Sequence, residues 1–199
     1  MRILAVCCHP SPESFHAGLK TAIVEQLTAA GHAVEVIDLY AEGFDPVMPR
    51  RQWEDSRRGG GSAPELSRHV DELRAAEGLL LIYPTWWYGM PAMIKGWVER
   101  VWQPGVAFEI KPDGGIQTEM LGNIRAFAIA TTHGSPQWFI RLAMGEPGRK
   151  QVVRGLTQHL AKGCRVSWNA LYNIDSGSAA ARERWRDRTA VKLARFFSA

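Results

Sequence analysis

The residues best suited to chemistry in this chain form an aromatic turn, Pro84-Thr85-Trp86-Trp87-Tyr88-Gly89-Met90-Pro91. An unbroken apolar run over 78–83 precedes it, and an amphipathic stretch over 91–102 follows. We therefore expect a buried strand, then the turn, then a helix. Open α/β sheets bind ligands at the carboxyl ends of their strands. Three adjacent aromatic rings at such an edge favour a flat apolar ligand, for which a flavin ring is the best candidate, although core or dimer packing would also use them.

A second candidate site follows the first apolar run, at 3–8. The loop His9-Pro10-Ser11-Pro12-Glu13-Ser14-Phe15 leads there into a stretch with helical periodicity over 15–30. It carries no G-x-G-x-x-G, the fingerprint of a dinucleotide site. Free amides in the first turn of a helix still bind phosphate, and Ser11, Ser14 and His9 would add donors. Simple capping of the helix by Ser11 or Ser14 explains the loop equally well.

A third loop, Thr131-Thr132-His133-Gly134-Ser135-Pro136, follows a later apolar run over 125–132. Its hydroxyls, backbone amides and imidazole would face the same crevice as the first two sites. An ordinary surface position for His133 is the simpler alternative.

Alternating elements must position these loops. The periodicity predicts strands and helices in turn. The strands are expected at 3–8, 33–39, 78–83, 125–132 and 165–172, and the helices at 15–30, 65–76, 91–102, 149–161 and from 179 onwards.

The character of the strands predicts their order. The first, third and fourth strands are continuously apolar, which is typical of strands buried on both faces, whereas the second and fifth alternate, which favours edge positions. We therefore predict an α/β fold, a flavodoxin-like three-layer sandwich with a five-stranded parallel sheet in the order 2-1-3-4-5. The first and third strands are then neighbours whose connections leave toward opposite faces, so the phosphate loop and the aromatic turn should meet at that switch point. We expect no regular elements in 41–63 and 103–123, and a flexible loop tip at 57–62.

Composition narrows the class of protein. A chain of 199 residues predicts one domain over 1–199. The net charge of +4 comes from scattered residues and gives no argument for nucleic acid. The three cysteines, Cys7, Cys8 and Cys164, make no disulfide framework, so we expect a cytoplasmic protein. Neither metal-ligand spacing nor a membrane-spanning run is visible, and we predict no metal and no membrane insertion.

Several of these segments together resemble the NAD(P)H:quinone oxidoreductase family of flavodoxin-like flavoproteins. The resemblance covers about two-thirds of the chain. The matching stretches are the loop from His9 to Phe15, Asp38-Leu39-Tyr40 with Phe44-Asp45-Pro46, the turn from Pro84 to Pro91, Ala92-x-x-Lys95-Gly96-Trp97-x-Glu99-Arg100-Val101, and Thr131-Thr132.

The resemblance implies roles for individual residues. It implies that His9, Ser14, Phe15 and His16 hold the flavin phosphates, and that Pro84, Thr85, Trp86, Trp87 and Tyr88 contact the flavin ring. It also implies that Thr131, Thr132, His133 and Gly134 lie at the pyrimidine side of that ring. His133 replaces a glycine of the family pattern. The family's Tyr and His near the nicotinamide are not evident, and Trp138 and Phe139 stand in that neighbourhood.

The implied function is two-electron reduction of a quinone or similar flat acceptor by NAD(P)H through bound FAD or FMN, with His133 and Tyr88 as candidate catalytic residues. The resemblance also implies a homodimer. Three alternatives stay open: a flavodoxin-type electron carrier, an ancillary flavoprotein that regulates a membrane transporter, and an α/β protein without flavin.

Overall fold

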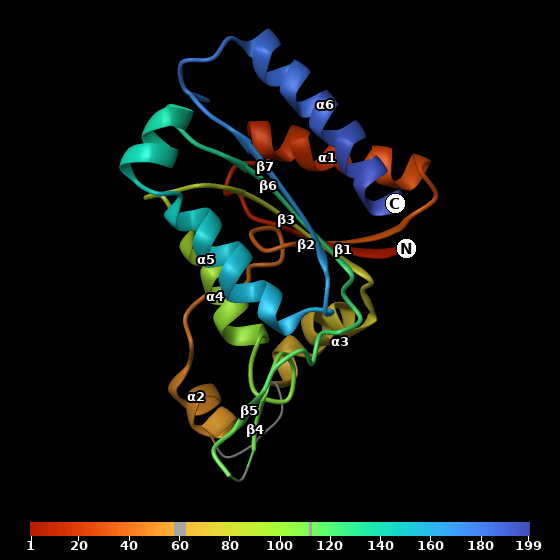
Figure 1. The fold of residues 1–199 in the computed structure, drawn as a ribbon, viewed down its shortest axis with the longest axis vertical. Helices are drawn as coiled ribbons and strands as arrows, with labels where there is room; N and C mark the ends of the chain where they lie inside the picture. Colours follow the sequence, from red (N-terminus) through yellow and green to blue (C-terminus); the bar gives the residue numbers. More distant parts are fainter. Residues whose placement is uncertain (58–62, 112) are drawn as a thin grey trace.

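A parallel five-stranded sheet forms the centre of the molecule, in the order β2-β1-β3-β6-β7 (Figure 1). The computed structural model describes residues 1–57, 63–111 and 113–199. The strands are β1 (Arg2–Cys7), β2 (Ala33–Asp38), β3 (Gly78–Pro84), β6 (Ala126–Thr132) and β7 (Arg165–Leu171). The predicted α/β class and the predicted order of the five strands are both confirmed.

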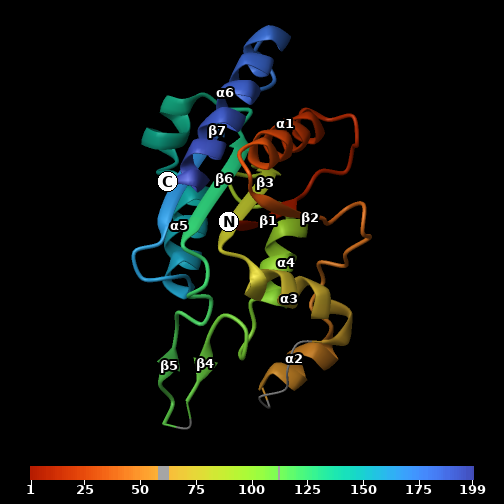
Figure 2. The ribbon, with the colours of Figure 1, turned by 90° about the vertical axis from the view of Figure 1, so that its right-hand side faces the viewer.

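Helices cover both faces of the sheet, as Figures 1 and 2 show. One face carries α1 (Phe15–Ala29) and α6 (Ala179–Ser198), and the other carries α3 (Ser67–Ala75), α4 (Ala92–Val101) and α5 (Pro147–Leu156). Each face has its own core: Leu19 and Leu193 belong to the first, and Leu73 and Trp97 to the second. The chain thus forms the predicted three layers.

Burial along the strands explains the order of the sheet. Every residue of β3 and β6 is buried, whereas β2 and β7 are only partly covered. The continuous apolar runs therefore lie at the centre of the sheet and the alternating runs at its edges, because only central strands are packed on both sides. No helix in the described part of the chain has the length and apolarity needed to cross a bilayer.

Two segments expected to be irregular contain short elements. The helix α2 (Arg50–Arg57) lies within 41–63, and the antiparallel pair β4 (Glu109–Ile110) and β5 (Ile116–Gln117) lies within 103–123. The helix α2 has almost no apolar stripe, and Gln52 is its one buried residue. Ion pairs at i,i+4 spacing join Arg50 to Glu54 and Arg51 to Asp55. Pattern analysis depends on an apolar stripe and therefore missed this helix.

Further short helices modify the predicted boundaries. The helix expected over 149–161 is α5 followed by a 3-10 turn at Thr157–His159, and a π-helical turn lies at Phe139–Ala143. A 3-10 turn at Pro64–Leu66 precedes α3. The loop tip predicted at 57–62 falls almost wholly outside the described residues.

Arg100 joins two of the sequence motifs that carried the family resemblance. Its buried guanidinium donates to the carbonyl of Asp45 at 2.6 Å, to Gln52 Oε1 at 2.8 Å and to Glu65 Oε1 at 3.0 Å. A Cβ on Gly96 would lie 2.2 Å from the carbonyl oxygen of Pro46. The motif on α4 and the motif at 44–46 therefore belong to one contact, in which the helix supports the loop after β2.

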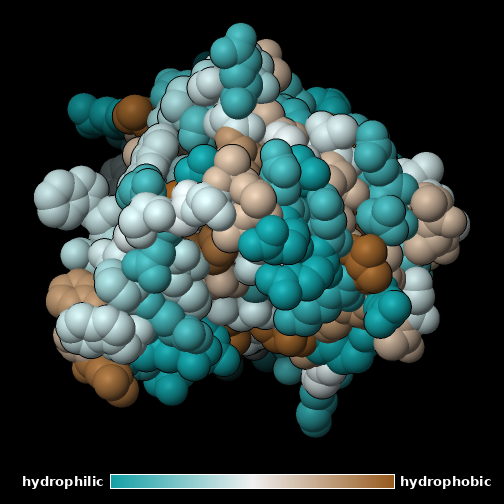
Figure 3. Space-filling view, turned by 90° about the horizontal axis from the view of Figure 1, so that it is seen from above, coloured by the Kyte–Doolittle hydropathy of each residue, from teal (hydrophilic) through white to brown (hydrophobic). Residues whose placement is uncertain are grey.

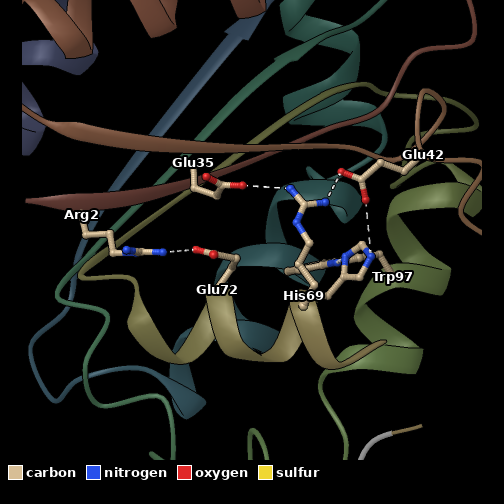
Figure 4. A network of polar contacts seen from close by, with 7 residues as sticks. Arg2, Glu35, Glu42, His69, Glu72 and Trp97 are labelled. Carbon is tan, nitrogen blue, oxygen red and sulfur yellow. Dashed lines mark hydrogen bonds and ion pairs between the residues drawn. The ribbon is translucent and has the colours of Figure 1, made fainter. Parts of the chain in front are cut away.

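A polar network fastens α3 to its neighbours (Figure 4). The Trp97 indole N–H donates to His69 Nδ1 at 3.2 Å, and His69 Nε2 lies 3.6 Å from the Glu42 carboxylate. Arg68 bridges Glu35 and Glu42 at 2.8 Å each. Burial lowers the pKa of His69 and so favours the neutral ring that accepts from Trp97. These contacts hold α4, the helix that leaves the aromatic turn.

Candidate functional site

The carboxyl ends of β1, β3 and β6 border one cavity of about 830 Å³. Most of the residues predicted from the sequence line it. They are His9, Ser14, Phe15, His16, Pro84, Thr85, Trp86, Trp87, Thr132 and Gly134. The three predicted loops therefore meet at the switch point between β1 and β3. A volume of this size is typical of a site for a cofactor or a drug-sized ligand.

The first turn of α1 presents free amides to this cavity. Ser14 is the N-cap, and its Oγ accepts the N–H of Ala17 at 3.2 Å. Among the described residues, no backbone or side-chain acceptor receives the N–H groups of Phe15 and His16. Ser14 thus caps the helix, which was the alternative to a phosphate site in the sequence analysis. The cap still leaves two backbone amides and the positive end of the helix dipole available to an anion.

The two histidines of the first loop stack on each other. The rings of His9 and His16 lie 5.4 Å apart at an interplanar angle of 9°, and His16 Nε2 lies 3.4 Å from Thr132 Oγ1. Burial, with a smaller contribution from His9, lowers the pKa of His16 to about 4. His16 is therefore a neutral hydrogen-bonding ring at pH 7 and carries no charge for a phosphate.

The aromatic turn has a strained backbone. Trp86 and Gly89 exchange backbone hydrogen bonds of 3.3 and 3.1 Å, and the two residues between them have positive φ, 49° at Trp87 and 63° at Tyr88. A turn of this kind normally carries glycine or asparagine, since the left-handed conformation costs other residues about 1–2 kcal/mol each. Strain of this kind is typical of functional sites, where the surrounding structure maintains it.

The turn displays its indole rings rather than burying them. The side chain of Trp87 is 95% exposed and that of Trp86 is 43% exposed. The ring of Trp86 lies 6.4 Å from that of His9 across the cavity. From behind, α5 supports the turn so closely that a Cβ on Gly148 would lie 2.7 Å from the carbonyl oxygen of Tyr88. The backbone of the turn is thus held at the cavity mouth, and the core alternative does not hold for Trp87.

His133 is buried, contrary to the surface-loop alternative. It is 5% exposed, and its ring stacks on Tyr172 with centroids 5.0 Å apart and an interplanar angle of 12°. The backbone N–H of His133 donates to the carbonyl of Leu171 at 2.7 Å, and the backbone carbonyl of His133 accepts the N–H of Ile174 at 3.1 Å. These contacts fix the ring through the loop that follows β7.

The imidazole of His133 has an unused nitrogen. Its Nε2 is buried and has no hydrogen-bond partner among the described residues. The residue His133 lines a smaller cavity of about 180 Å³ together with Tyr88, and Thr85, Trp87 and Gly134 border both cavities. Burial lowers the pKa of His133 to about 4, although Glu146 opposes the shift. At pH 7 the ring is therefore neutral, able to donate or accept one further hydrogen bond.

Thr131 lies behind the cavity rather than on its wall. Its side chain is fully buried, and its Oγ1 lies 2.8 Å from Oγ1 of Thr85. The hydroxyl therefore ties the third loop to the aromatic turn, and the structure gives it no direct access to either cavity.

Sequence analysis missed the part of the cavity formed by α6 and the loop before it. The missed lining residues there are Ile174, Asp175, Ala179, Arg182, Glu183 and Arg186, and beside the first loop Glu13 and Gly18 were also missed. Arg182 donates to the carbonyl of Ile174 at 3.1 Å, which joins α6 to the loop before it. The available signal was the pair Arg182 and Arg186, four residues apart at the start of a helix that must begin at the same edge of the sheet.

The cysteines of β1 supply no nucleophile. Cys7 and Cys8 are buried on opposite faces of the sheet. Burial raises the pKa of both thiols, to about 12 for Cys8. Both are therefore protonated at pH 7 and supply no thiolate to this site.

A family model described as "Flavodoxin-like fold" matches residues 1–193. The chain belongs to this family. The match agrees with the sheet order β2-β1-β3-β6-β7, which the sequence prediction derived from the burial pattern of the strands.

Individual relatives extend the comparison. The chain is 34% identical over 108 residues to "Uncharacterized NAD(P)H oxidoreductase YcaK" of Escherichia coli (strain K12), covering 54% of this chain and 55% of that protein. It is 26% identical over 156 residues to "Ribosyldihydronicotinamide dehydrogenase [quinone]" of Pongo abelii, covering 70% and 67%. The match thus spans about half the length of the first relative and two-thirds of the second.

A solved structure shares the whole fold. The NAD(P)H:quinone oxidoreductase from Methanothermobacter marburgensis superposes with a TM-score of 0.83 over 98% of each chain, at 24% identity. At that identity the likeness shows the common architecture.

Proposed function

We propose that this chain is a flavin-dependent oxidoreductase that uses NAD(P)H to reduce quinones or similar flat acceptors. The observation that carries the proposal is that an anion cradle and an exposed aromatic turn border one cavity, with His9 of the first loop 6.4 Å from Trp86 of the second. A phosphorylated, flat cofactor needs both features in one cavity. The names of the relatives support the same class of reaction.

The residues present fit a flavin. The free amides of Phe15 and His16 would bind its phosphate, and Pro84, Thr85, Trp86 and Trp87 would lie along its ring. His133 Nε2, which is buried and has no hydrogen-bond partner in the part of the chain that the structure describes, would bond to the polar edge of the ring or to the acceptor. An unpaired buried ring nitrogen costs stability, so a ligand that bonds to it recovers that cost.

The reach of the cavity favours FAD over FMN. Beyond the α1 cradle the cavity continues past Ile174 to Arg182, Glu183 and Arg186 of α6. FMN ends at its phosphate and would leave this region open. In FAD the second phosphate and the adenosine would continue into it, where guanidinium groups suit a pyrophosphate and Glu183 suits ribose hydroxyls.

Bound flavin would supply the redox step, in which NAD(P)H and one proton reduce a quinone to a hydroquinone and leave NAD(P)⁺. The protein's part is to orient and to exclude water. The exposed face of Trp87 and the smaller cavity beside Tyr88 and His133 form the place where the nicotinamide and the acceptor would lie in turn. His133, neutral at pH 7, would donate its N–H toward an acceptor oxygen as negative charge develops there.

A homodimer is part of the proposal. Several apolar side chains are exposed on the described surface, and they include Ile110 at 57%, Ile116 at 65% and Leu142 at 81%. Apolar residues exposed together on β4 and β5 suit a protein interface. A cytoplasmic location stays a prediction.

The proposal is tested by steady-state assay. The FAD-loaded protein is mixed with NADH or NADPH and 1,4-benzoquinone, and nicotinamide oxidation is followed at 340 nm. We expect saturable turnover and ping-pong kinetics, because donor and acceptor share one place. Flavin-loaded protein that exchanges electrons only with a protein partner would favour the carrier alternative and would contradict the proposal.

A further inference from the structure

A separate cavity of about 300 Å³ lies between β7, α6 and the π-helical turn at 139–143. It shares no lining residue with the cavity proposed for flavin. It is lined by Gln137, Arg141, Trp168, Asn169, Ala170, Tyr172, Trp185, Arg188, Thr189 and Lys192. The proposed flavin chemistry gives this cavity no role.

The charge of this cavity has one sign. Its lining includes three cations and no carboxylate. Arg141 lies 3.5 Å from Glu146. Over the described ranges of the chain, Arg188 and Lys192 have no carboxylate within ion-pair distance, and as residues four apart on α6 they point the same way. Two unpaired cations on one wall raise the local concentration of anions.

The remaining walls are aromatic. Trp168, Tyr172 and Trp185 are each partly buried. Tyr172 is held from behind by its stack on His133, and Trp185 by its packing against Phe15 at 6.2 Å. These contacts restrain the rings of Tyr172 and Trp185, and all three aromatic residues border the cavity. Fixed aromatic surfaces favour a flat ligand, since little side-chain entropy is lost on binding.

A polar floor completes the site. Asn169 is buried, and its Nδ2 donates to the carbonyl of Ile129 at 3.1 Å and to Ser167 Oγ at 3.1 Å. These bonds fix the amide, so its side-chain oxygen stays available as an acceptor for a ligand hydroxyl or N–H group.

We propose that this cavity binds a planar aromatic anion, such as an aromatic carboxylate, with its ring among Trp168, Tyr172 and Trp185 and its charge on Arg188 and Lys192. A bare inorganic anion would use the cations and leave the aromatic walls without a partner. A neutral arene would contact the aromatic walls and leave the cations without a partner. Only a ligand with both parts matches the whole lining.

The test titrates 2-naphthoate into the full chain saturated with FAD, by isothermal calorimetry. We expect one site with a dissociation constant below about 1 mM. The double variant Arg188→Gln/Lys192→Gln should weaken binding by about tenfold or more, because it removes both charge-assisted contacts. The matched control is Arg184→Gln/Arg195→Gln, which removes two cations of the same helix that do not line the cavity. This control should bind as the unchanged protein does.

Two further probes separate the parts of the proposal. 2-Naphthalenemethanol keeps the ring and lacks the charge, and inorganic phosphate keeps a charge and lacks the ring, so both should bind more weakly than 2-naphthoate. Absence of naphthoate binding, equal binding in the double variant and the control, or equal binding of phosphate and naphthoate would each overturn the proposal. Circular dichroism of each variant confirms that the fold is intact, as expected for exposed positions on one helix.

Discussion

The imidazole ring of His9 lies 6.4 Å from the indole ring of Trp86, although the two residues come from loops that follow different strands. Their connections leave the sheet on opposite faces, α1 on one and α4 on the other. The pair therefore marks the point where a ligand can lie across the sheet edge with its phosphate at one loop and its ring at the other.

Replacing Trp87 by glycine separates stability from cofactor binding. Because Trp87 has a φ of 49°, glycine removes backbone strain, and we expect Trp87→Gly to leave the free energy of unfolding unchanged or raise it by up to about 1 kcal/mol. Loss of the ring should weaken FAD binding by about tenfold. Urea unfolding and FAD titration measure the two effects.

The matched control for that variant is Trp138→Gly. Trp138 is also exposed, at 63%, but it has right-handed helical angles. Its replacement should lower stability by about 1 kcal/mol and leave FAD affinity unchanged. Equal FAD affinity in Trp87→Gly and in the unchanged protein would remove the aromatic turn from the proposed site.

His133 and His159 form a second matched pair. Each has a buried ring nitrogen that finds no hydrogen-bond partner in the described ranges of the chain, but His159 packs against Trp102 and Phe108, away from the cavity. We expect His133→Gly to slow acceptor reduction by about 10–100-fold, because the variant loses one hydrogen bond to a group that becomes charged. His159→Gly should alter stability alone. Stopped-flow measurement of the two half-reactions tests this, and unchanged rates in His133→Gly would show that the ring takes no part.

Gly96 should tolerate no side chain. A Cβ there would lie 2.2 Å from the carbonyl oxygen of Pro46, so Gly96→Ala must displace the loop after β2 or the helix α4. We expect a loss of about 3 kcal/mol or failure to fold. Gly155→Ala is the control, since that position in α5 has open space and alanine favours helix by up to about 1 kcal/mol. Thermal unfolding should move in opposite directions for the two variants.

Stability should decrease on mild acidification. His16 and His133 have pKa values lowered from 6.5 to about 4, so between these values the unfolded chain binds more protons than the folded one. The contribution of each neutral ring is complete above about pH 6.5 and is lost as the pH falls toward 4, on the order of 3 kcal/mol per histidine across the whole range.

Urea unfolding at pH 7.0, 5.5 and 4.5 measures this dependence. In the variant His16→Asn/His133→Asn, the free energy of unfolding should fall less steeply with decreasing pH than in the unchanged protein. The carboxylates contribute equally to both proteins. Parallel curves for the two proteins would show that neither histidine is buried as a neutral ring.

The sequence predicted the fold well because its strands differ in their pattern of apolar residues. Continuous apolar runs such as 78–83 are typical of central strands, and an alternating run such as 165–172 suits an edge, so the predicted order followed from the expected burial. The helix α2 was missed because it has almost no buried face, and the strands β4 and β5 because two-residue strands have no measurable period.

The candidate site was predictable where a loop follows a strand. Trp86, Trp87 and Thr132 lie directly at strand ends, so topology alone brings them together. The contribution of Arg182 and Arg186 depends on how α6 packs beside α1, and their spacing of four residues does not by itself report that packing. The burial of His133 likewise depends on the ring of Tyr172, which lies far away in the sequence.

Titration of FAD into the flavin-free protein tests the central claim most directly. We expect one FAD per chain, with quenching of the flavin fluorescence by the indole rings of the turn, and tighter binding of FAD than of FMN because the cavity continues to α6. Protein that is folded by circular dichroism and binds neither FAD nor FMN would contradict the account.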